Sequence, residues 1–281
     1  MPPPKHASRI YPILRWRDDC QSAVEDHLTV EEPLEIRVNG APVAVTMRTP
    51  GHDEELAAGF CLTEGIVSNA DEIVRVAVCD DSSDDNIVDV SLEDSDAVHR
   101  AVENSQRATY LSSSCGLCGK QTLDHIEQAT RPFAHATPRI THAMLSELAT
   151  AMRQRQTVFS RTGGLHSACL FDSTGSLIAL REDIGRHNAV DKVIGHCLLQ
   201  RRSDYAEKSI LVISGRSSFE VVQKAAVARI PIVAAVSAPS SLATDLAKRL
   251  DMTLVGFLRE SRFNIYHGGE RLPHRTDDGS D

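Results

Sequence analysis

Beyond residue 162 the sequence alternates short apolar runs with amphipathic segments of helix length, and this alternation constrains the fold more than any other feature. The pattern predicts three strands with helices between them, at residues 209–214, 217–229, 232–237, 240–250 and 253–258. An apolar hairpin at 166–180 and a helix at 185–199 precede them. Strands that alternate with helices form parallel sheets through right-handed crossovers. We therefore predict an α/β fold of three layers, α/β/α, whose mixed sheet begins with two antiparallel strands.

The N-terminal part of the chain predicts a smaller α+β unit. Two β-rich runs within 33–48 meet at Asn39 and Gly40, a pair that favours a two-residue hairpin turn. A helix, a further strand pair and two short helices are expected after it, at 52–64, 73–79, 87–92, 122–129 and 143–154. We divide the chain into an N-terminal α+β domain, a CxxC loop with a linker helix, an α/β/α domain and a disordered tail, at 1–110, 111–130, 131–272 and 273–281.

The distribution of charge narrows the classes of ligand. The 281 residues carry a net charge of −9, which argues against general binding to nucleic acid or to an anionic membrane. Nine acidic residues and one arginine between Asp80 and Glu103 give that segment a local net charge of −8. From Arg161 to Arg271, 15 basic residues face 11 acidic ones, a net of +4. The C-terminal part is therefore the better place for a small anionic ligand.

Cysteine usage and the N-terminal sequence predict a location in the cell. Seven cysteines without regular spacing indicate free thiols in a reducing compartment. The first residues, MPPPKHASRIYPILRW, lack the apolar stretch of a signal peptide. No window approaches the roughly 18 apolar residues of a membrane span. We expect a cytoplasmic protein.

A serine-rich turn occurs twice where a predicted strand gives way to a helix. The two copies are Ser214-Gly-Arg-Ser217-Ser218 and Ser237-Ala-Pro-Ser240-Ser241, 23 residues apart. Parallel strands bring both turns to one edge of the sheet, and free N–H groups at a helix N-terminus favour phosphate. The alternative is that these serines only cap their helices.

The most reactive motif is Cys115-Gly-Leu-Cys118 in the segment SSSCGLCGKQT. Tetrahedral zinc needs four ligands and the sequence has no second CxxC, so we expect no bound metal. A helix N-terminus and Lys120 nearby would favour the thiolate, which is the nucleophilic form. We interpret the motif as a reactive thiol pair on a loop, with a structural or metal role as the alternative. The other cysteines are dispersed, and most lie in apolar segments typical of buried positions: Cys20, Cys61, Cys79, Cys169 and Cys197.

A second group of polar residues surrounds the start of the helix at 185–199. It comprises His166, Asp183, Arg186, His187 and Asn188, beside a glycine. Such a density of polar groups is unusual for a purely structural segment. A base, a phosphate and a metal all stay open as its ligand.

Taken together, these segments resemble the formate dehydrogenase accessory sulfurtransferase family, known as FdhD. The stretches that carry the resemblance are PLEIRVNG, ELAAGFCLTEGI, SSSCGLCGK, TGGLHSACLF, REDIGRHNAVDKVIG, SGRSSFEVVQKAA, IPIVAAVSAPSSLATDLA and LVGFLRESRFNIYHGGERL. The acidic insert and both tails match no motif. A match over so many segments is far more specific than a single CxxC.

The resemblance implies a sulfur carrier with a cytidine-deaminase-like fold. A cysteine desulfurase would pass persulfide sulfur to Cys115, with Cys118 as its partner. The sulfur would go on to the molybdenum bis(molybdopterin guanine dinucleotide) cofactor before that cofactor enters formate dehydrogenase. The family also implies a homodimer, and it makes 131–272 the cofactor-binding domain.

The matching cofactor-binding stretch is Phe257, Leu258, Arg259, Glu260, Ser261 and Arg262. From phosphate geometry, and not from the family, we add His187, Ser214, Ser217 and Ser237. A surface ion pair between Arg259 and Glu260 is the alternative role for that part of the stretch.

Two other functions are weighed against this one. A zinc nucleoside deaminase is suggested by the order of strands, but its chemistry needs Pro-Cys-x-x-Cys and a His/Cys-x-Glu motif. Ser114 precedes Cys115, and no matching glutamate motif is present. The second is a non-catalytic chaperone that binds the cofactor and apo formate dehydrogenase. Persulfide formation on Cys115 separates a carrier from both.

Overall fold

The computed structural model describes residues 7–79, 86–93, 130–133, 138–202 and 205–273. Within these residues the chain forms three sheets, of six, four and two strands. The CxxC loop, the helix expected at 122–129, most of the acidic segment and the tail beyond 273 lie outside the described residues.

The six-stranded sheet has the order β12-β11-β10-β9-β7-β8. Its strands are β7 (His166–Phe171), β8 (Leu177–Asp183), β9 (Ile210–Ile213), β10 (Ile232–Ala235), β11 (Thr253–Gly256) and β12 (Asn264–His267). Strands β9, β10 and β11 are parallel, and β7 pairs antiparallel with β8 and β9. The prediction of a mixed sheet beginning with an antiparallel pair is confirmed. The edge strand β12 was not predicted; it is exposed at Asn264 and Ile265 and lacks the apolar run of the buried strands.

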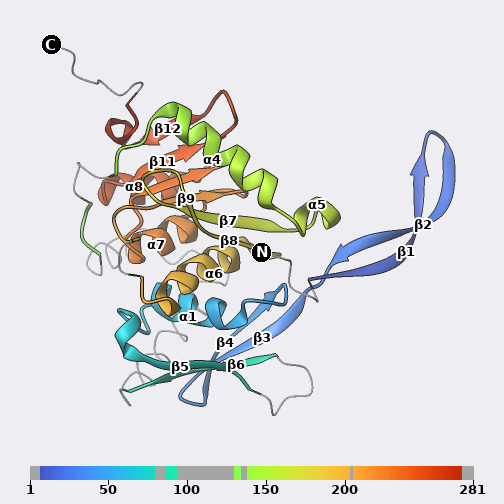
Figure 1. Ribbon diagram of the computed structural model, residues 1–281, viewed down its shortest axis with the longest axis horizontal. Helices are drawn as coiled ribbons and strands as arrows, with labels where there is room; N and C mark the ends of the chain where they lie inside the picture. Colours follow the sequence, from blue (N-terminus) through green and yellow to red (C-terminus); the bar gives the residue numbers. More distant parts are fainter. Residues whose placement is uncertain (1–6, 80–85, 94–129, 134–137, 203–204, 274–281) are drawn as a thin grey trace.

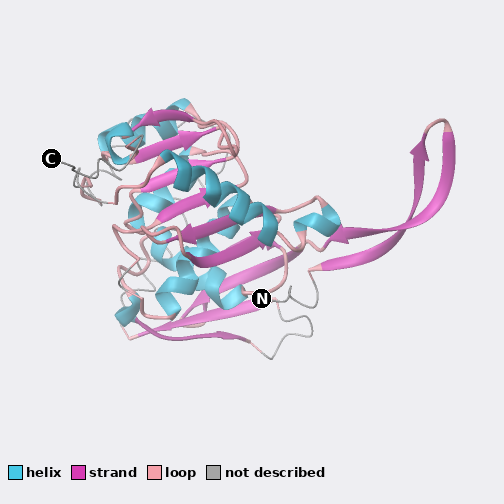
Figure 2. Cartoon of the chain, turned by 45° about the horizontal axis from the view of Figure 1, so that its top comes forward, coloured by secondary structure: helices cyan, strands magenta, loops and turns pink. Residues whose placement is uncertain are grey.

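Helices cover both faces of this sheet, which confirms the three layers (Figures 1 and 2). The helices are α4 (His142–Arg155), the short α5 (Phe159–Thr162), α6 (Arg186–Leu199), α7 (Phe219–Val227) and α8 (Ser241–Arg249). Helix α4 packs Leu145, Leu148 and Met152 on one face. Helices α6, α7 and α8 bury their apolar residues against the other. With helices on both sides, β9, β10 and β11 are buried along their whole length, which explains their continuous apolar sequences.

The N-terminal unit contains the four-stranded sheet and one long helix. Its elements are β3 (Glu32–Val38), β4 (Ala41–Arg48), α1 (Asp53–Thr63), β5 (Ile73–Val78) and β6 (Ile87–Leu92), with 3₁₀ turns at Ala70–Glu72 and, later in the chain, Gly269–Arg271. The sheet order is β4-β3-β6-β5. Asn39 (φ 47°) and Gly40 (φ 79°) both adopt positive φ, the conformation of a type I′ turn, so the predicted hairpin is confirmed.

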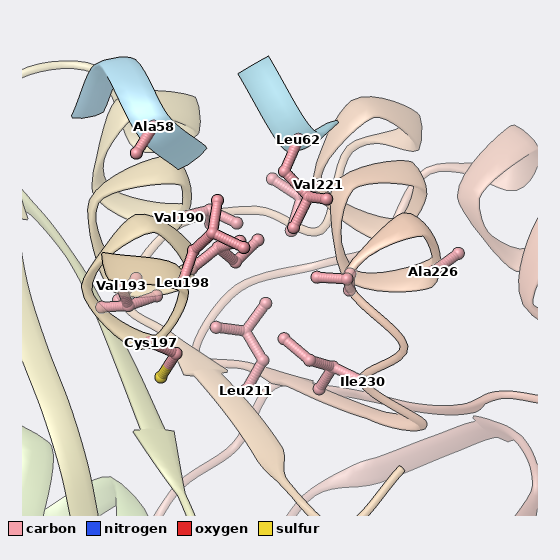
Figure 3. Packing of buried hydrophobic residues seen from close by; sticks show 14 of the residues in the cluster. Ala58, Leu62, Val190, Val193, Cys197, Leu198, Leu211, Val221, Ala226 and Ile230 are labelled. Atoms are coloured by element: carbon pink, nitrogen blue, oxygen red, sulfur yellow. The ribbon is translucent and has the colours of Figure 1, made fainter. Parts of the chain in front are cut away.

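Helices α1 and α6 cross at backbone contact, and this crossing joins the two units. A Cβ on Gly59 would lie 1.9 Å from the Asp191 carbonyl oxygen, and one on Gly195 would lie 1.8 Å from that of Glu55. Only glycine permits such an approach. Side chains of α1, α6 and α7 then meet in one apolar core, in which Leu62 lies near Val221 (Figure 3). The predicted N-terminal and α/β/α units therefore share a core.

A two-stranded hairpin precedes these units and was not predicted. It consists of β1 (Ser8–Arg17) and β2 (Cys20–Thr29), paired along their whole length. The hairpin projects away from the other sheets as a long arm (Figure 1). We call it the arm. The second strand, CQSAVEDHLT, lacks the regular apolar and polar alternation that predicts a half-buried strand, so no hairpin was expected here.

Candidate functional site

The two serine turns lie side by side at one edge of the six-stranded sheet, as predicted. The Ser237 amide donates to the Gly215 carbonyl (3.4 Å), and the Ser217 amide donates to the Ala238 carbonyl (3.2 Å). The Ser240 amide in turn donates to the Ser217 carbonyl (3.0 Å). The same edge carries the start of β7 and the end of β8, because these strands run antiparallel to each other.

A groove of about 800 Å³ lies between this edge and the C-terminal half of α4. Six of the predicted binding residues line it: Ser214, Leu258, Arg259, Glu260, Ser261 and Arg262. The opposite wall consists of residues that sequence analysis did not select, among them Arg153, Gln156 and Phe159. A groove of this size is typical of sites for small molecules and cofactors.

The stretch from Phe257 to Arg262 forms a tight turn held by its own backbone. Phe257 has a φ of 54°, unusual for a residue with a side chain. Its amide donates to the Ser237 carbonyl (3.1 Å), which joins the turn to the second serine turn. The Arg259 guanidinium donates to the carbonyls of Val236 (2.6 Å) and Leu258 (2.8 Å). Arg259 therefore braces the turn, and the ion pair with Glu260 is absent among the described contacts.

Arg262 differs from Arg259 in that its side chain makes no hydrogen bond within this turn among the described contacts. Its carbonyl accepts from the Arg259 amide (2.9 Å), while the residue is exposed at the groove. Phe257 is 43% exposed beside the groove. Of the two predicted arginines, Arg262 is thus the one placed to contact a ligand.

Gln156 connects α4 to the floor of the groove. It is only 6% exposed, and its Nε2 donates to the Ser167 hydroxyl at 2.8 Å. The Ser167 amide donates to the Ser214 hydroxyl, also at 2.8 Å. No local pattern in the sequence could have identified Gln156, since it follows an ordinary helix and meets β7 only in the folded chain.

The predicted polar group at the start of α6 divides into two parts. Asp183 is fully buried and accepts hydrogen bonds from the amides of Gly185 (2.8 Å) and Thr49 (3.2 Å). Its carboxylate also contacts the Lys192 ammonium (2.6 Å) and accepts from the Asn188 amide group (3.0 Å). Through these contacts Asp183 and Asn188 fix α6 to the N-terminal unit.

His187 faces the first serine turn. Its Nε2 lies 3.1 Å from the Ser218 hydroxyl, and its Nδ1 lies 3.1 Å from Glu220. Burial, with Arg186 and Lys224 nearby, lowers the pKa of His187 to about 3. The imidazole is thus neutral, so we assign the proton to Nδ1, which donates to Glu220, while Nε2 accepts from Ser218.

His166 lines the groove beside the same turn, and Arg186 lies close to Gly215 of that turn. A Cβ on Gly215 would be 3.2 Å from His166 Nδ1 and 3.7 Å from the Arg186 Cβ. Burial, and then the charges of Arg186 and Arg216, lower the pKa of His166. The buried Nε of Arg186 has no hydrogen-bond partner within the described part of the chain. The positive charge at this edge thus comes from arginines and not from the histidines.

The remaining predicted serines have different surroundings. Ser240 caps α8, because its hydroxyl accepts from the Ala243 amide at 3.2 Å. Ser217 is 0% exposed between the two turns, and its hydroxyl has no partner among the described residues. Ser237 is half-buried and contributes its carbonyl to the Phe257 turn.

A buried charge network fixes the position of α7. The Lys224 ammonium contacts Asp191 of α6 (3.0 Å), and both Glu64 (2.9 Å) and the Thr63 hydroxyl (2.9 Å) at the end of α1. Lys224 is 1% exposed, so these partners compensate the cost of burying its charge. The network therefore ties the first serine turn to α1 and α6.

The cysteines outside the CxxC motif follow the prediction in most cases. Cys61, Cys169 and Cys197 are buried, Cys79 is half-buried, and Cys20 is exposed at the tip of the arm. Burial raises the pKa of Cys61 to about 12, so its thiol is unreactive at neutral pH. Cys115 and Cys118 lie outside the described residues.

Two further observations concern metal binding and membrane-spanning helices in the described residues. They contain no group of three or more His, Cys, Asp or Glu side chains arranged to hold a metal ion. None of the helices in this part of the chain is long and apolar enough to cross a membrane.

Comparison with known proteins gives consistent matches over most of the chain. The FdhD/NarQ family model matches residues 29–273. A protein of Streptomyces coelicolor named "Sulfur carrier protein FdhD" is 47% identical over 271 residues, covering 94% of this chain and 95% of that protein. A protein of the same name from Mycobacterium tuberculosis is 47% identical, covering 87% and 91%.

A solved structure shows the same arrangement of elements. The crystal structure of a chain from Desulfotalea psychrophila, named for a formate dehydrogenase accessory protein, superposes with a TM-score of 0.76 at 27% identity. The match covers 95% of this chain and 100% of that one. It therefore includes both the N-terminal unit and the sheet edge described above.

Proposed function

The chain belongs to the FdhD/NarQ family, and from this premise we propose that it is a sulfur carrier for formate dehydrogenase. It accepts persulfide sulfur from a cysteine desulfurase and passes it to the molybdenum bis(molybdopterin guanine dinucleotide) cofactor before that cofactor enters the enzyme. The names of relatives that are 47% identical over most of the chain support the carrier role. The cofactor is the substrate that receives the sulfur.

The first chemical step is transfer of sulfur to Cys115. The Cys115 thiolate attacks the outer sulfur of the donor's persulfide, so that a new S–S bond forms on Cys115 while the donor's S–S bond breaks and its cysteine leaves as a thiolate. The donor persulfide is the source of the transferred sulfur, and no external oxidant is needed. A desulfurase regenerates its persulfide from free cysteine.

The second step releases the sulfur. The Cys118 thiolate attacks the inner sulfur, which is Sγ of Cys115, and the outer sulfur leaves as sulfide toward molybdenum. The two cysteines are then joined by a disulfide, which a thiol reductant must reduce before the next cycle. In this scheme Cys115 is the carrier and Cys118 is the resolving residue.

The groove at the sheet edge is the observation that carries the cofactor part of the proposal. It brings the turn at 258–262 together with Ser214 and His166 in about 800 Å³. Arg153 and Arg262 line the groove and supply positive charge, and two helix N-termini at the same edge favour phosphate. We place the guanine nucleotide part of the cofactor here, with its phosphates toward the serine turns.

Further details of the proposal concern classification, location and partners. We assign the six-stranded sheet to the cytidine-deaminase-like type, because helices cover both its faces and β9, β10 and β11 are parallel. We propose that the protein works in the cytoplasm as a homodimer. Its partners are a cysteine desulfurase and the catalytic subunit of formate dehydrogenase.

Persulfide formation tests the carrier role. After incubation with a desulfurase and cysteine, intact-protein and peptide mass spectrometry should find the added sulfur on Cys115. Cys118→Ala should accumulate this persulfide, because the resolving thiol is absent, while Cys20→Ala, which removes an exposed cysteine elsewhere, should behave as wild type. Full formate dehydrogenase activity in cells that contain only Cys115→Ala would favour the non-catalytic chaperone.

Titration with guanosine diphosphate, a surrogate for the nucleotide part, tests the groove. Arg262→Ala should weaken binding by about tenfold or more, as expected for loss of a charge-assisted contact to phosphate. Arg201→Ala is the matched control, because Arg201 follows the far end of α6 and is exposed there. Unchanged affinity in both Arg262→Ala and Arg259→Ala would place the nucleotide elsewhere.

A further inference from the structure

The arm exposes more apolar surface than a short soluble hairpin normally does. Trp16 is 67% exposed, Leu14 69%, Ile10 56% and Tyr11 45%. Trp16 is also the single tryptophan of the chain. Large exposed apolar patches on soluble proteins mark contact surfaces.

One face of the arm is apolar along most of β1. Because side chains alternate between faces, residues 10, 12, 14 and 16 share a face, and they are Ile10, Pro12, Leu14 and Trp16. The pairing of β1 with β2 places a second row on this face, which is polar apart from Ala23: Gln21, Ala23, Glu25 and His27. The arm thus presents a continuous apolar row to solvent.

Within the described part of the chain, the contacts of the arm with the other elements lie near its base. There the Thr29 hydroxyl donates to the Thr162 hydroxyl of α5 at 3.0 Å, and Arg9 pairs with Glu32 at 3.0 Å. An isolated two-stranded hairpin is marginally stable in water. A hairpin with ten residues in each strand therefore needs a surface to pack against.

We propose that the arm is a dimerisation element, which packs its apolar face against the arm of a second copy of this chain and reaches with its tip to the partner's body. The inference rests on the proposed homodimer and assigns its contact surface. A two-fold axis through the middle of the arm makes the apolar row complementary to itself, as an isologous interface requires.

The area of the arm explains why the tip must reach the partner's body. Ten residues per strand give a ribbon roughly 34 Å long and about 10 Å wide, so one face offers about 340 Å². A stable interface buries about 800 Å² on each partner. Contact between the two arms alone is therefore too small, and both faces of each arm must be covered.

Charge at the two ends of the arm fits this arrangement. The tip carries Asp18 and Asp19, both exposed and both with positive φ. At the base, the last turn of α4 and the short α5 expose Arg153, Arg155 and Arg161. The proposed two-fold axis places each acidic tip beside the partner's arginines. These arginines also lie near the groove, which Arg153 lines.

Sedimentation velocity and the fluorescence of Trp16 over a dilution series test the proposal on the full chain. Wild type should be a dimer at high concentration with Trp16 shielded from water, and its emission should shift to the red as the dimer dissociates. Leu14→Asp keeps the tryptophan and should raise the dissociation constant about tenfold or more, as loss of an apolar anchor does. At a concentration at which both proteins are monomeric, its thermal unfolding should match wild type, since the arm contributes little to the core.

Val74→Asp is the matched control, because Val74 is similarly exposed (62%) but lies on β5. It should dimerise as wild type does. Replacing Asp18 and Asp19 by Lys should also weaken the dimer, and a partner that carries Arg155→Glu and Arg161→Glu should restore it.

Two outcomes overturn the proposal and are distinguishable. A wild-type chain that stays monomeric with Trp16 exposed would refute the homodimer and leave the arm for another protein. A dimer that Leu14→Asp does not weaken would refute the arm as its interface while the homodimer stands. Persulfide formation on Cys115 is measured separately, so neither result is confused with failure of the carrier role.

Discussion

The two serine turns have nearly the same sequence and lie on neighbouring strands, yet their serines have different environments. In the sequence, Ser217 aligns with Ser240. In the sheet, Ile213 of β9 pairs with Ala235 of β10, an offset of 22 residues, and the isolated bridge of Ser217 with Pro239 continues this register. Ser218 is therefore the spatial counterpart of Ser240, and each is the N-cap residue of its helix.

This offset of one residue decides what each hydroxyl contacts. A one-residue shift in a strand turns a side chain to the opposite face. Ser217 is thus enclosed between the turns, Ser218 bonds to His187 and does not cap its helix, and Ser240 caps α8. The comparison shows that a repeated local motif predicts where a turn lies but does not predict which contacts its side chains make. Substitutions in and beside the two turns test this difference.

The largest effect is expected at Gly256, which lies below the second turn. A Cβ there would be 2.9 Å from both the Pro239 ring and the Tyr266 ring, and neither ring can move freely. Gly256→Ala should lower the free energy of unfolding by about 2 to 3 kcal/mol, measured by denaturant titration. In Gly215→Ala beside the first turn, the new Cβ has no contact shorter than 3.2 Å, to His166 Nδ1, so this change should cost clearly less. Equal costs would contradict the tighter packing of the second turn.

Of the two serine turns, the first should make the stability of the chain depend on pH, through His187. Its pKa is about 3 in the folded chain against 6.5 in the unfolded one. Below pH 6.5 the unfolded chain binds a proton that the folded chain does not, so stability falls as the pH falls. Between pH 7 and 5 this site should remove about 1 to 2 kcal/mol.

His187→Asn should therefore lose correspondingly less stability over the same interval, as chemical denaturation at each pH would measure. A slope that His187→Asn leaves unchanged would exclude a buried neutral imidazole at this turn.

Ser240→Ala removes a helix cap and should cost about 1 kcal/mol in the free energy of unfolding. Thermal and denaturant unfolding would measure this loss. Ser240→Asp, which retains a cap acceptor, should recover most of it. A neutral effect of Ser240→Ala would show that the cap of the second turn contributes nothing.

The smallest effect is expected for Ser217→Ala. Because the Ser217 hydroxyl is buried without a partner among the described residues, its removal should change stability by at most about 0.5 kcal/mol, or increase it slightly. Ser218→Ala is informative beside it, since it breaks the contact with His187. A loss of 1 kcal/mol or more in Ser217→Ala would indicate a hidden partner for this hydroxyl.

The sequence by itself determined the alternation of strands and helices from β7 to β11, the antiparallel start of the main sheet and the meeting of the two serine turns at one edge. These features depend on local periodicity and on short turn motifs such as Asn39-Gly40, which act within a few residues. It also contained the motifs that carry the family resemblance. The role of Cys115 and Cys118 in sulfur transfer remains a prediction from sequence and chemistry.

Only the tertiary structure decided which side chains meet at the site. Gln156 and Arg153 reach the groove because α4 packs across the sheet, and Asp183 is withdrawn from it because Thr49 and Lys192 bind its carboxylate. The contact between Gly59 and Asp191 likewise joins residues far apart in sequence. The physical reason is that burial, register and charge depend on neighbours from distant segments, and a local pattern carries no information about them.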